Sequence, residues 1–275
     1  MENASRLTIG RETTLCMSLS GRPGTFGSRF HNHLYAALGL DYVYKAFTTS
    51  DLPAAIAGIR ALGVRGCAIS MPFKEACIPL LDELAPSARA IQSVNTIVND
   101  GGWLTGHNTD YGAIAPLLAR HGVTPDTPFA LHGSGGMAKA VASALRDRGH
   151  TQGTIVARNQ QTGRALAEGC GYGYLDTLGA LRPRMLINVT PLGMAGADAE
   201  RLPFDEAAID AAEVVFDVVA LPVETPFVKR ARAVNKRVIT GGEVIALQAV
   251  GQFVLYTGVT PSPEQLDAAQ RYALG

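Results

Sequence analysis

A glycine-rich loop near the middle of the chain has the residue types and spacing that bind the phosphates of a nucleotide. Residues 129–146, FALHGSGGMAKAVASALR, place a short apolar run before the glycines and a helix-forming run after them. In a dinucleotide fingerprint, the glycines allow a tight turn and a close approach to the pyrophosphate, which the N-terminus of the following helix binds. Ala138 stands where a third glycine would be. We predict cofactor contacts by Gly133, Ser134, Gly135, Gly136, Met137 and Ala138.

The segment after the next predicted strand indicates which dinucleotide binds. About 20 residues past such a loop, an NAD enzyme has an Asp or Glu that bonds the ribose 2′-hydroxyl. This chain has Ala157-Arg158-Asn159 there, with no carboxylate to repel a 2′-phosphate. The Arg158 guanidinium is able to bind that phosphate through charge-assisted hydrogen bonds. The segment therefore favours NADP over NAD, with Arg158 and Asn159 as contacts; the alternative is that Arg158 is a solvated charge at a strand end.

A second group of polar residues lies in the N-terminal part of the chain. Lys74 follows an apolar run and a proline in GCAISMPFKEA, Asn95 lies near the start of another run, and Asn108-Thr-Asp110 stands where the next one ends. Each position has a purely structural explanation, with Lys74 as a solvated residue at a helix start and Asp110 as a helix N-cap. The local sequence leaves the structural and the functional explanations open.

The elements that position these residues follow a βαβ pattern. Short apolar runs rich in Val, Ile and Tyr alternate with longer segments of helical period, which is typical of helices around a parallel sheet. The predicted strands are residues 14–19, 42–47, 66–70, 96–99, 129–132, 154–157, 185–188, 214–218 and 237–239. A polar, proline-bearing stretch predicts a domain boundary between residues 108 and 125.

Two helices are predicted at the C-terminal end of the chain. The segment GGEVIALQAVGQFVLYTG is apolar on so many sides that its helix must be buried between layers or between domains. The segment SPEQLDAAQRYALG follows as a shorter helix, with Ser262 and Pro263 in its start positions.

Composition excludes several classes of partner. Twenty-four basic and 24 acidic residues give a formal charge of zero, and the scattered basic residues argue against nucleic acid. Without a signal-peptide layout or an apolar run near ~18 residues, we expect a cytoplasmic protein that does not contact membranes. The four cysteines form no CxxC pair, which indicates reduced, buried thiols. His31 and His33 have no partner cluster, so we expect no metal, a helix-start cap at His31 and a surface position for His33.

Taken together, the motifs resemble the shikimate dehydrogenase family over nearly the whole chain. They are MPFKE with Lys74, SARAIQSVNTIVN with Asn95, GHNTDYGA with Asp110, the glycine loop, INVTPLGM at 187–194, ETPF at 224–227 and LQAVGQFVLYTG with Gln248. The resemblance implies an α/β protein of two domains. Residues 1–108 plus 240–275 form the substrate-binding and catalytic domain, and residues 109–239 form a Rossmann-type doubly wound NADP domain. The C-terminal helices return to the first domain.

The resemblance also implies an activity. Family members reversibly reduce the ketone of 3-dehydroshikimate with a nicotinamide hydride, a step of aromatic amino acid biosynthesis in the chorismate pathway, and a Lys and Asp pair handles the proton. Lys74 and Asp110 match that pair. An ammonium stabilises the charge growing on the carbonyl oxygen, and a nearby carboxylate keeps the lysine charged, so we expect Lys74 to act chiefly as positioner and electrostatic partner.

Further positions are assigned by the same resemblance. Ser70, Asn95 and Gln248 match residues that bond the substrate ring, whereas Thr190, Val218 and Gly241 match cofactor-lining positions. The small-molecule partner is a cyclic carboxylic acid, and we expect a monomer or homodimer.

The residues that grip the substrate carboxylate depart from the family pattern Ser-x-Ser-Pro-x-x-His-Asn. Counting back from His31-Asn32, the hydroxyl positions fall on Thr25 and Gly27, and the proline falls on Ser28. One hydroxyl is kept and one is lost, unless Ser28, Ser18 or Ser20 replaces it. Arg22 is either a substitute anion partner or a surface charge. We assign Thr25 and Ser28 to substrate binding.

Three other positions differ from the family. Ala220 replaces a tyrosine that helps to hold the carboxylate, and Val244 replaces a methionine that packs on the nicotinamide. The second arginine of the ribose region falls on Thr162, unless Arg164 replaces it. Losing one charge-assisted contact costs about 1.5–3 kcal/mol, or roughly tenfold to a hundredfold in affinity. We therefore expect weaker NADP binding than in relatives.

Three functions remain open from the sequence. The first is an NADP-dependent oxidoreductase acting on shikimate or a closely related cyclic hydroxy acid. The second is a quinate or other ring-acid dehydrogenase with altered substrate, using NAD in the quinate case, which Arg158 disfavours. The third is a non-catalytic relative that binds a metabolite or nucleotide, which the retention of Lys74, Asp110, Asn95 and Gln248 disfavours.

Overall fold

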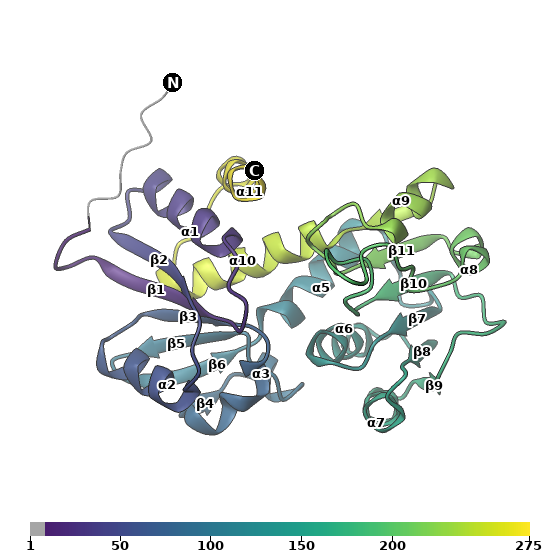
Figure 1. Ribbon diagram of the computed structural model, residues 1–275, viewed down its shortest axis with the longest axis horizontal. Helices are drawn as coiled ribbons and strands as arrows, with labels where there is room; N and C mark the ends of the chain where they lie inside the picture. The colour runs from purple at the N-terminus through teal and green to yellow at the C-terminus, as the bar shows by residue number, and fades with distance from the viewer. Residues whose placement is uncertain (1–8) are drawn as a thin grey trace. The chain divides into compact units, whose positions relative to one another are not determined.

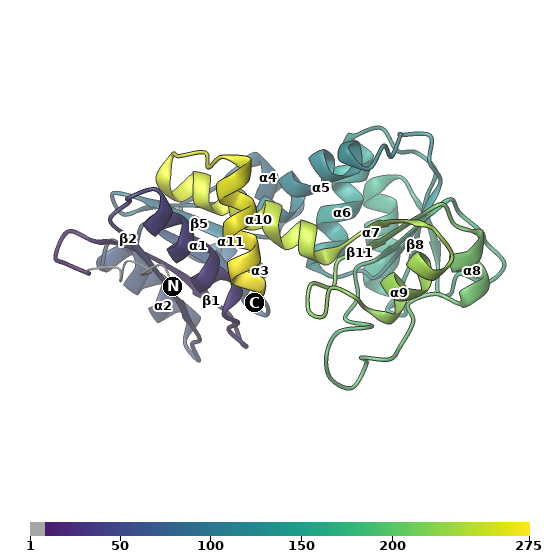
Figure 2. The same cartoon turned by 90° about the horizontal axis from the view of Figure 1, so that it is seen from above.

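The computed structural model describes residues 9–275, and within them the chain divides into two compact units. The first contains the residues up to Thr109 together with Gln248–Gly275, and the second contains Asp110–Leu247. The predicted domains were divided at 108/109 and 239/240, so the units differ from them chiefly in where α10 is cut. Figure 1 and Figure 2 show the elements of each unit.

The strands and helices of the two units have the following bounds. The strands are β1 Thr14–Leu19, β2 Tyr42–Phe47, β3 Gly66–Ile69, β4 Glu83–Leu84, β5 Thr96–Asp100, β6 Trp103–His107, β7 Phe129–His132, β8 Gly153–Val156, β9 Gly173–Leu175, β10 Met185–Asn188, β11 Val214–Asp217 and β12 Arg237–Ile239. The helices are α1 Phe26–Ala37, α2 Leu52–Ala61, α3 Phe73–Ala76, the 3₁₀ turn η1 Ile78–Leu80, α4 Pro86–Arg89, α5 Thr109–Arg120, α6 Gly136–Asp147, α7 Gln160–Cys170, α8 Glu206–Ala211, α9 Pro226–Ala233, α10 Gly241–Thr257 and α11 Pro263–Leu274.

The sheet of the first unit is mixed and has the strand order β2-β1-β3-β5-β6-β4. β1 runs parallel to β2 and β3, whereas β5 is antiparallel to both β3 and β6. The expectation of a parallel sheet is therefore wrong for β5 and β6. They form a hairpin whose turn uses Gly101 and Gly102 at φ +62° and +97°, the left-handed region that glycine adopts without strain.

Alternation along these strands builds a core on each face of the first sheet. Successive residues of a strand point to opposite faces. Met17 and Cys67 pack with Ile56 and Ile59 of α2 on one face. The other face carries Cys16, Tyr44 and Val98 with residues of α1, α10 and α11, and Figure 2 shows α1 beside α11.

The second unit has a parallel sheet in the order β12-β11-β10-β7-β8-β9. This is the doubly wound arrangement of dinucleotide-binding folds, in which the order reverses between β7 and β10. One face packs against α5, α6 and α7, and the other packs against α8 and α9. Because both faces are covered, these strands, apart from the edge strand β9, are largely apolar, which is why their bounds were predictable.

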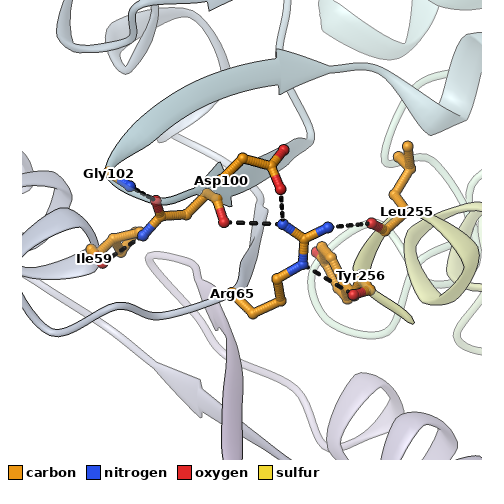
Figure 3. A network of polar contacts seen from close by, with 7 residues as sticks. Ile59, Arg65, Asp100, Gly102, Leu255 and Tyr256 are labelled. Carbon is orange, nitrogen blue, oxygen red and sulfur yellow. Dashed lines mark hydrogen bonds and ion pairs between the residues drawn. The ribbon is translucent and has the colours of Figure 1, made fainter. Parts of the chain in front are cut away.

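Arg65 attaches the C-terminal end of α10 to the sheet of the first unit. Figure 3 shows its guanidinium donating to the carbonyls of Leu255 and Tyr256 and to that of Asn99, at 3.3, 3.0 and 2.9 Å, and it also pairs with Asp100. The last carbonyls of a helix lack partners within it, so a cation satisfies them and interacts favourably with the helix dipole.

The residue next to Arg65 makes room for the same helix. A Cβ at Gly66 would lie 2.1 Å from the ring of Tyr256. The absence of a side chain at this position therefore allows the aromatic ring to pack directly on β3.

The structure corrects the predicted role of His31. This residue does not cap a helix start, because α1 already begins at Phe26 and His31 is fully buried within it. Its ring stacks on that of Tyr44, with centroids 4.5 Å apart. The His-Asn pair was taken as a helix entrance because the residues before it are polar, yet those residues form the first turn of the helix.

All nine predicted strands are confirmed, with ends within one residue of those observed. The strands β4, β6 and β9 were not among the nine predicted. β4 and β9 have two and three residues, too few to show a period-2 pattern. β6 is the run that ends just before Asn108, which the predicted strands did not include. Across residues 9–275, no helix has both the length and the apolar character needed to cross a membrane.

Replacing Arg65 tests its role as the anchor of α10. We expect Arg65→Met to lower the free energy of unfolding by about 1.5–3 kcal/mol, because hydrogen bonds from a charged donor are lost and carbonyls of the last turn are left unpaired. Denaturant titration followed by circular dichroism measures this change. Arg11→Met is the matched control, since its ion pair with Glu12 is exposed, and it should change stability little. Equal shifts in the two variants would contradict the anchoring role.

Candidate active site

The backbone of Lys74 is held beside the segment that leads into β5. After β3 the chain passes the exposed Ser70, whose carbonyl accepts the Phe73 N–H at 2.9 Å where α3 begins. The carbonyl of Lys74 accepts the Val94 N–H at 2.8 Å, and the Lys74 side chain is half-buried. Two segments separated along the sequence are thereby fixed to each other at the position of the lysine.

Asn95, directly before β5, is fully buried and forms the centre of this region. Its side-chain oxygen accepts the Thr109 N–H and the Thr96 hydroxyl, both at 2.8 Å, and its side-chain nitrogen donates to the Thr109 hydroxyl at 3.0 Å. Its carbonyl accepts the Ile69 N–H at 2.7 Å. One amide thus joins the end of β3, the start of β5 and the start of α5.

Asp110 follows Thr109 and lies in the first turn of α5 with 1% of its surface exposed. It is therefore not the N-cap residue, which was the structural alternative for this position. A carboxylate in the first helical turn is stabilised by the helix dipole. The preceding loop is held by Asn108, whose backbone N–H donates to the Ser87 hydroxyl and whose side chain donates to the Ser93 carbonyl.

The loop after β1 lies against the segment that precedes Lys74. The Gly21 N–H donates to the Met71 carbonyl at 2.9 Å, and a Cβ on Gly21 would lie 3.1 Å from Pro72. This loop leads to Thr25, which is exposed just before α1, and to Ser28, which is half-buried in its first turn.

Of the other carboxylate candidates, Ser20 has a partner within its own loop. The hydroxyl of Ser20 accepts the Arg22 N–H at 3.1 Å, which ties the first part of the loop to itself. At Gly27, where the family pattern has its second hydroxyl, an added Cβ would be 3.4 Å from the Tyr44 ring. The ring of Tyr44 therefore lies against the position where the hydroxyl is lost.

Gln248 is half-buried in α10, and Gln252 lies one turn further along the same helix. Gln252, which was not predicted as a site residue, is buried and donates to the Asn95 carbonyl and the Thr96 hydroxyl. The available signal was the spacing of two glutamines four residues apart, which places them on one face of a helix.

In the second unit, the predicted strand, glycine loop and helix are confirmed as β7, residues 133–135 and α6. Gly133 has φ +131°, and a Cβ there would lie 2.8 Å from Val189 and 3.3 Å from Thr190. A Cβ on Gly135 meets nothing within 4 Å. The loop therefore has a glycine that its turn requires and an open approach to the start of a long helix, which fits a bound pyrophosphate.

Arg158 and Asn159 follow β8 and are both exposed. The Asn159 side chain accepts the Thr162 N–H at 3.2 Å and so caps α7. The Thr162 hydroxyl lies 2.7 Å from that of Ser134 in the glycine loop. Arg164 stacks over the Tyr174 ring, 4.7 Å from its centroid. The residue after Arg158 is thus joined through Thr162 to the glycine loop, whereas Arg164 lies over the Tyr174 ring.

A buried carboxylate connects the motifs INVTPLGM and ETPF. Asp217, at the end of β11, accepts the Asn188 side-chain N–H at 3.0 Å, the Val219 N–H at 3.1 Å and the Thr225 hydroxyl at 2.6 Å. Asn188 in turn accepts the backbone N–H and the hydroxyl of Thr190. Burial raises the pKa of Asp217, and the hydrogen bonds from Thr225, Val219 and Asn188 oppose that rise. Asp217 was not predicted to have a role.

Gly241 and Val218, both predicted to line the cofactor, are brought together by the backbone. A Cβ on Gly241 would lie 2.2 Å from the carbonyl oxygen of Val219 and 2.5 Å from that of Val218, so only glycine fits at the start of α10. Val244 is buried in the apolar core of this unit. Among the described residues, no cluster of His, Cys, Asp or Glu side chains is suited to hold a metal ion.

The doubly wound sheet and its glycine loop define a dinucleotide-binding fold, and comparison with known proteins gives the family. The family described as the shikimate dehydrogenase substrate binding domain matches residues 25–97. A shikimate dehydrogenase-like protein from Haemophilus influenzae is 54% identical over 266 residues, which cover 96% of this chain and 98% of that protein. The chain belongs to the shikimate dehydrogenase family.

Solved structures agree with this assignment. A shikimate 5-dehydrogenase-like protein has a TM-score of 0.93 and 53% identity, with 98% of this chain and 100% of that chain covered. Shikimate 5-dehydrogenase from Thermus thermophilus, solved in complex with NADP(H) and shikimate, has a TM-score of 0.85 and 30% identity, with coverages of 94% and 99%.

Removing the Asp217 carboxylate tests whether it connects the motifs of the second unit. Asp217→Ala leaves three buried donors without a partner, and each costs roughly 1–3 kcal/mol, so we expect stability to fall by at least about 3 kcal/mol. Thermal and denaturant unfolding measure the loss. The control is Asp205→Ala, which removes an exposed N-cap of α8 and should cost about 0.5–2 kcal/mol. A loss at Asp217 no greater than that at Asp205 would contradict the assignment.

Proposed function

We propose that this protein is an NADP-dependent oxidoreductase that interconverts 3-dehydroshikimate and shikimate or a closely related cyclic hydroxy acid. The observation that carries the proposal is the hydrogen-bonded junction at Asn95. It holds the backbone of Lys74 and the start of α5, where Asp110 lies, to the same short segment. In a member of this family, these are the segments that match the proton-handling pair.

The chemistry assigned to Lys74 follows from its charge. NADPH supplies the hydride for ketone reduction. As the carbonyl carbon is reduced, negative charge grows on its oxygen, and the ammonium of Lys74 stabilises that charge and donates a proton to it. We assign Asp110 the role of orienting the amine and favouring its protonated form. Ser70, Asn95 and Gln248 are proposed to bond the hydroxyl groups or ketone of the ring.

The cofactor preference rests on Arg158. It is exposed, its strand end has no carboxylate, and Ser134 and Thr162 lie nearby with hydroxyl groups. A guanidinium forms charge-assisted hydrogen bonds with a phosphate, which only NADP carries on its ribose. We propose that Gly133–Ala138 hold the pyrophosphate, while Thr190, Val218 and Gly241 line the rest of the site.

The substrate carboxylate is the part for which this chain departs most from its family. We propose Thr25 and Ser28 as its hydrogen-bond donors, because both lie at the start of α1 and the loop before them packs against Met71. With glycine at position 27 and alanine at position 220, fewer hydroxyls are available than in the family pattern. A preference for a ring acid other than shikimate is consistent with this loss.

We further propose that the protein works in the cytoplasm, as a monomer or homodimer, without a nucleic-acid or membrane partner. The balanced charge, with no basic stripe, supports this. The expected place in metabolism is aromatic amino acid biosynthesis.

Replacing Lys74 tests the proposed chemistry. We expect Lys74→Ala to lower kcat by about 10²–10⁴, because the transition state loses its proton donor and its nearest positive charge. The measurement is NADPH absorbance with shikimate, and in parallel with quinate and amino analogues. The Kd for NADP should be unchanged. Lys45→Ala is the control, because Lys45 lies on the exposed side of β2 over the Phe47 ring.

Two outcomes would contradict the proposal. One is a Lys74→Ala variant with near-normal kcat. The other is a wild-type protein that binds a ring acid and NADP but turns over none of the acids tested, which would support the non-catalytic alternative.

A further inference from the structure

Gln252 is a buried amide that the chemistry assigned above does not use. It lies in α10 with 5% of its surface exposed. Its side-chain nitrogen donates to the Thr96 hydroxyl at 3.1 Å and to the Asn95 carbonyl at 3.3 Å. Burying an amide is costly unless it is hydrogen-bonded, so these two bonds fix where the glutamine side chain lies.

The hydrogen bond from Gln252 to the Thr96 hydroxyl determines the direction of the hydrogen bond between Thr96 and Asn95. A hydroxyl has a single hydrogen to donate. Because Thr96 accepts from Gln252, its hydrogen is directed to the side-chain oxygen of Asn95, 2.8 Å away. The Thr109 N–H donates to that same oxygen. Two donors therefore hold the Asn95 oxygen, and the amide cannot flip without placing its N–H groups against them.

The fixed orientation of the Asn95 amide determines which of its hydrogen-bonding groups remains for a ligand. One N–H of its amide nitrogen is used on the Thr109 hydroxyl at 3.0 Å. An amide nitrogen has two such hydrogens, so the second is directed away from Thr109. In this orientation the group left for the proposed bond between Asn95 and a ring oxygen is an N–H donor rather than an acceptor.

The ring groups on the side of Gln252 that faces α1 are uncharged. Burial lowers the pKa of His31 to about 3, and Gln252 is the side chain that opposes this shift. His31 is thus neutral at ordinary pH. The other ring groups around it are the uncharged Tyr44, Phe253 and Tyr256. The amide of Gln252 is therefore aligned by Thr96 and Asn95 and not by an ion.

We propose that Gln252 is a positioning residue of the substrate site, which sets the orientation of the Asn95 amide through Thr96 and through the Asn95 carbonyl. The proposal rests on the function proposed above, because it takes Asn95 to bond the ring. Gln252 does not itself touch the reacting atoms. Its loss should affect the ring acid and leave the cofactor unaffected.

The kinetic test uses Gln252→Met, which keeps the length of the side chain but donates no hydrogen bond. We expect kcat/KM for the ring acid to fall about tenfold, with the KM for NADP unchanged. Thr96→Val should have the same effect, Thr96→Ser should retain activity, and Thr96→Val should add little in the Gln252→Met background, because both act through one path. Thr257→Val is the matched control on α10, where the lost hydroxyl bonds Phe253.

A second measurement does not depend on turnover. We expect the Asn95 side-chain amide resonances in ¹H–¹⁵N spectra to shift and to exchange faster with water in Gln252→Met, but not in Thr257→Val. Gln252→Glu is the second variant if Gln252→Met does not fold. Its carboxylate accepts the Thr96 hydrogen and so withdraws it from Asn95, and the resonances should again shift.

The outcomes separate the two proposals. Unchanged Asn95 resonances, or an equal loss of kcat/KM in Thr257→Val, would overturn the role of Gln252. A wild-type protein without turnover would overturn the proposed function, while the spectra would still decide whether Gln252 holds Asn95.

Discussion

The first unit depends on one constraint: the fully buried amide of Asn95 must be satisfied by hydrogen bonds. A buried amide without partners costs several kcal/mol, so its donors and acceptors must come from nearby segments. For the side-chain amide they come from Thr96 and Thr109, and the backbone carbonyl of the same residue accepts the Ile69 N–H. Satisfying the polar groups of Asn95 therefore requires the end of β3 and the starts of β5 and α5 to lie in fixed positions.

The segments that carry Lys74 and Asp110 are directly connected to the residues around Asn95. Lys74 is bonded through its carbonyl to Val94, the residue before Asn95, and Asp110 follows Thr109. Phe73 of α3 packs against the apolar core, and backbone hydrogen bonds join Lys74 to Val94 and the loop after β1 to Met71. Positioning of this kind fixes the backbone of Lys74 while its side chain stays half-buried.

Asp217 has the same role in the second unit. Three donors converge on its carboxylate: Asn188 at the end of β10, and Val219 and Thr225 in the segment between β11 and α9. The carboxyl ends of the strands are where ligands bind in doubly wound sheets. The two units thus share a design in which one buried polar side chain holds together loops that carry family motifs.

The sequence predicted those features that depend on local pattern. Except for β9, the strands of the doubly wound sheet were predictable because they are apolar runs between helices. The glycine loop was predictable because Gly133 follows one of these strands directly. The start of α11 was predicted from Ser262 and Pro263, and the structure confirms Ser262 as the N-cap, in a capping box with Gln265. The resemblance to a family supplied the roles of Lys74 and Asp110, which local sequence left open.

Features that depend on tertiary contacts were not predictable. Nothing near Gln252 in the sequence indicates that it meets Thr96, 156 residues away. His31 follows a polar stretch that looks like the approach to a helix, and only its packing against Tyr44 shows that it is part of the core. The two adjacent glycines, Gly101 and Gly102, are a sequence signal for a hairpin. The βαβ pattern of the chain favoured a parallel sheet instead, so this hairpin was not predicted. Arg65 was not identified because its partners lie at the far end of the chain.

The most direct test of the account is a crystal structure of the protein with shikimate and NADP bound. We predict that the ring hydroxyl that is oxidised lies within hydrogen-bond distance of the Lys74 ammonium, with the Asn95 amide nitrogen on the ring and the carboxylate against Thr25 or Ser28. A ring bound out of reach of Lys74, or an Asn95 amide that presents its oxygen to the ring, would contradict the account.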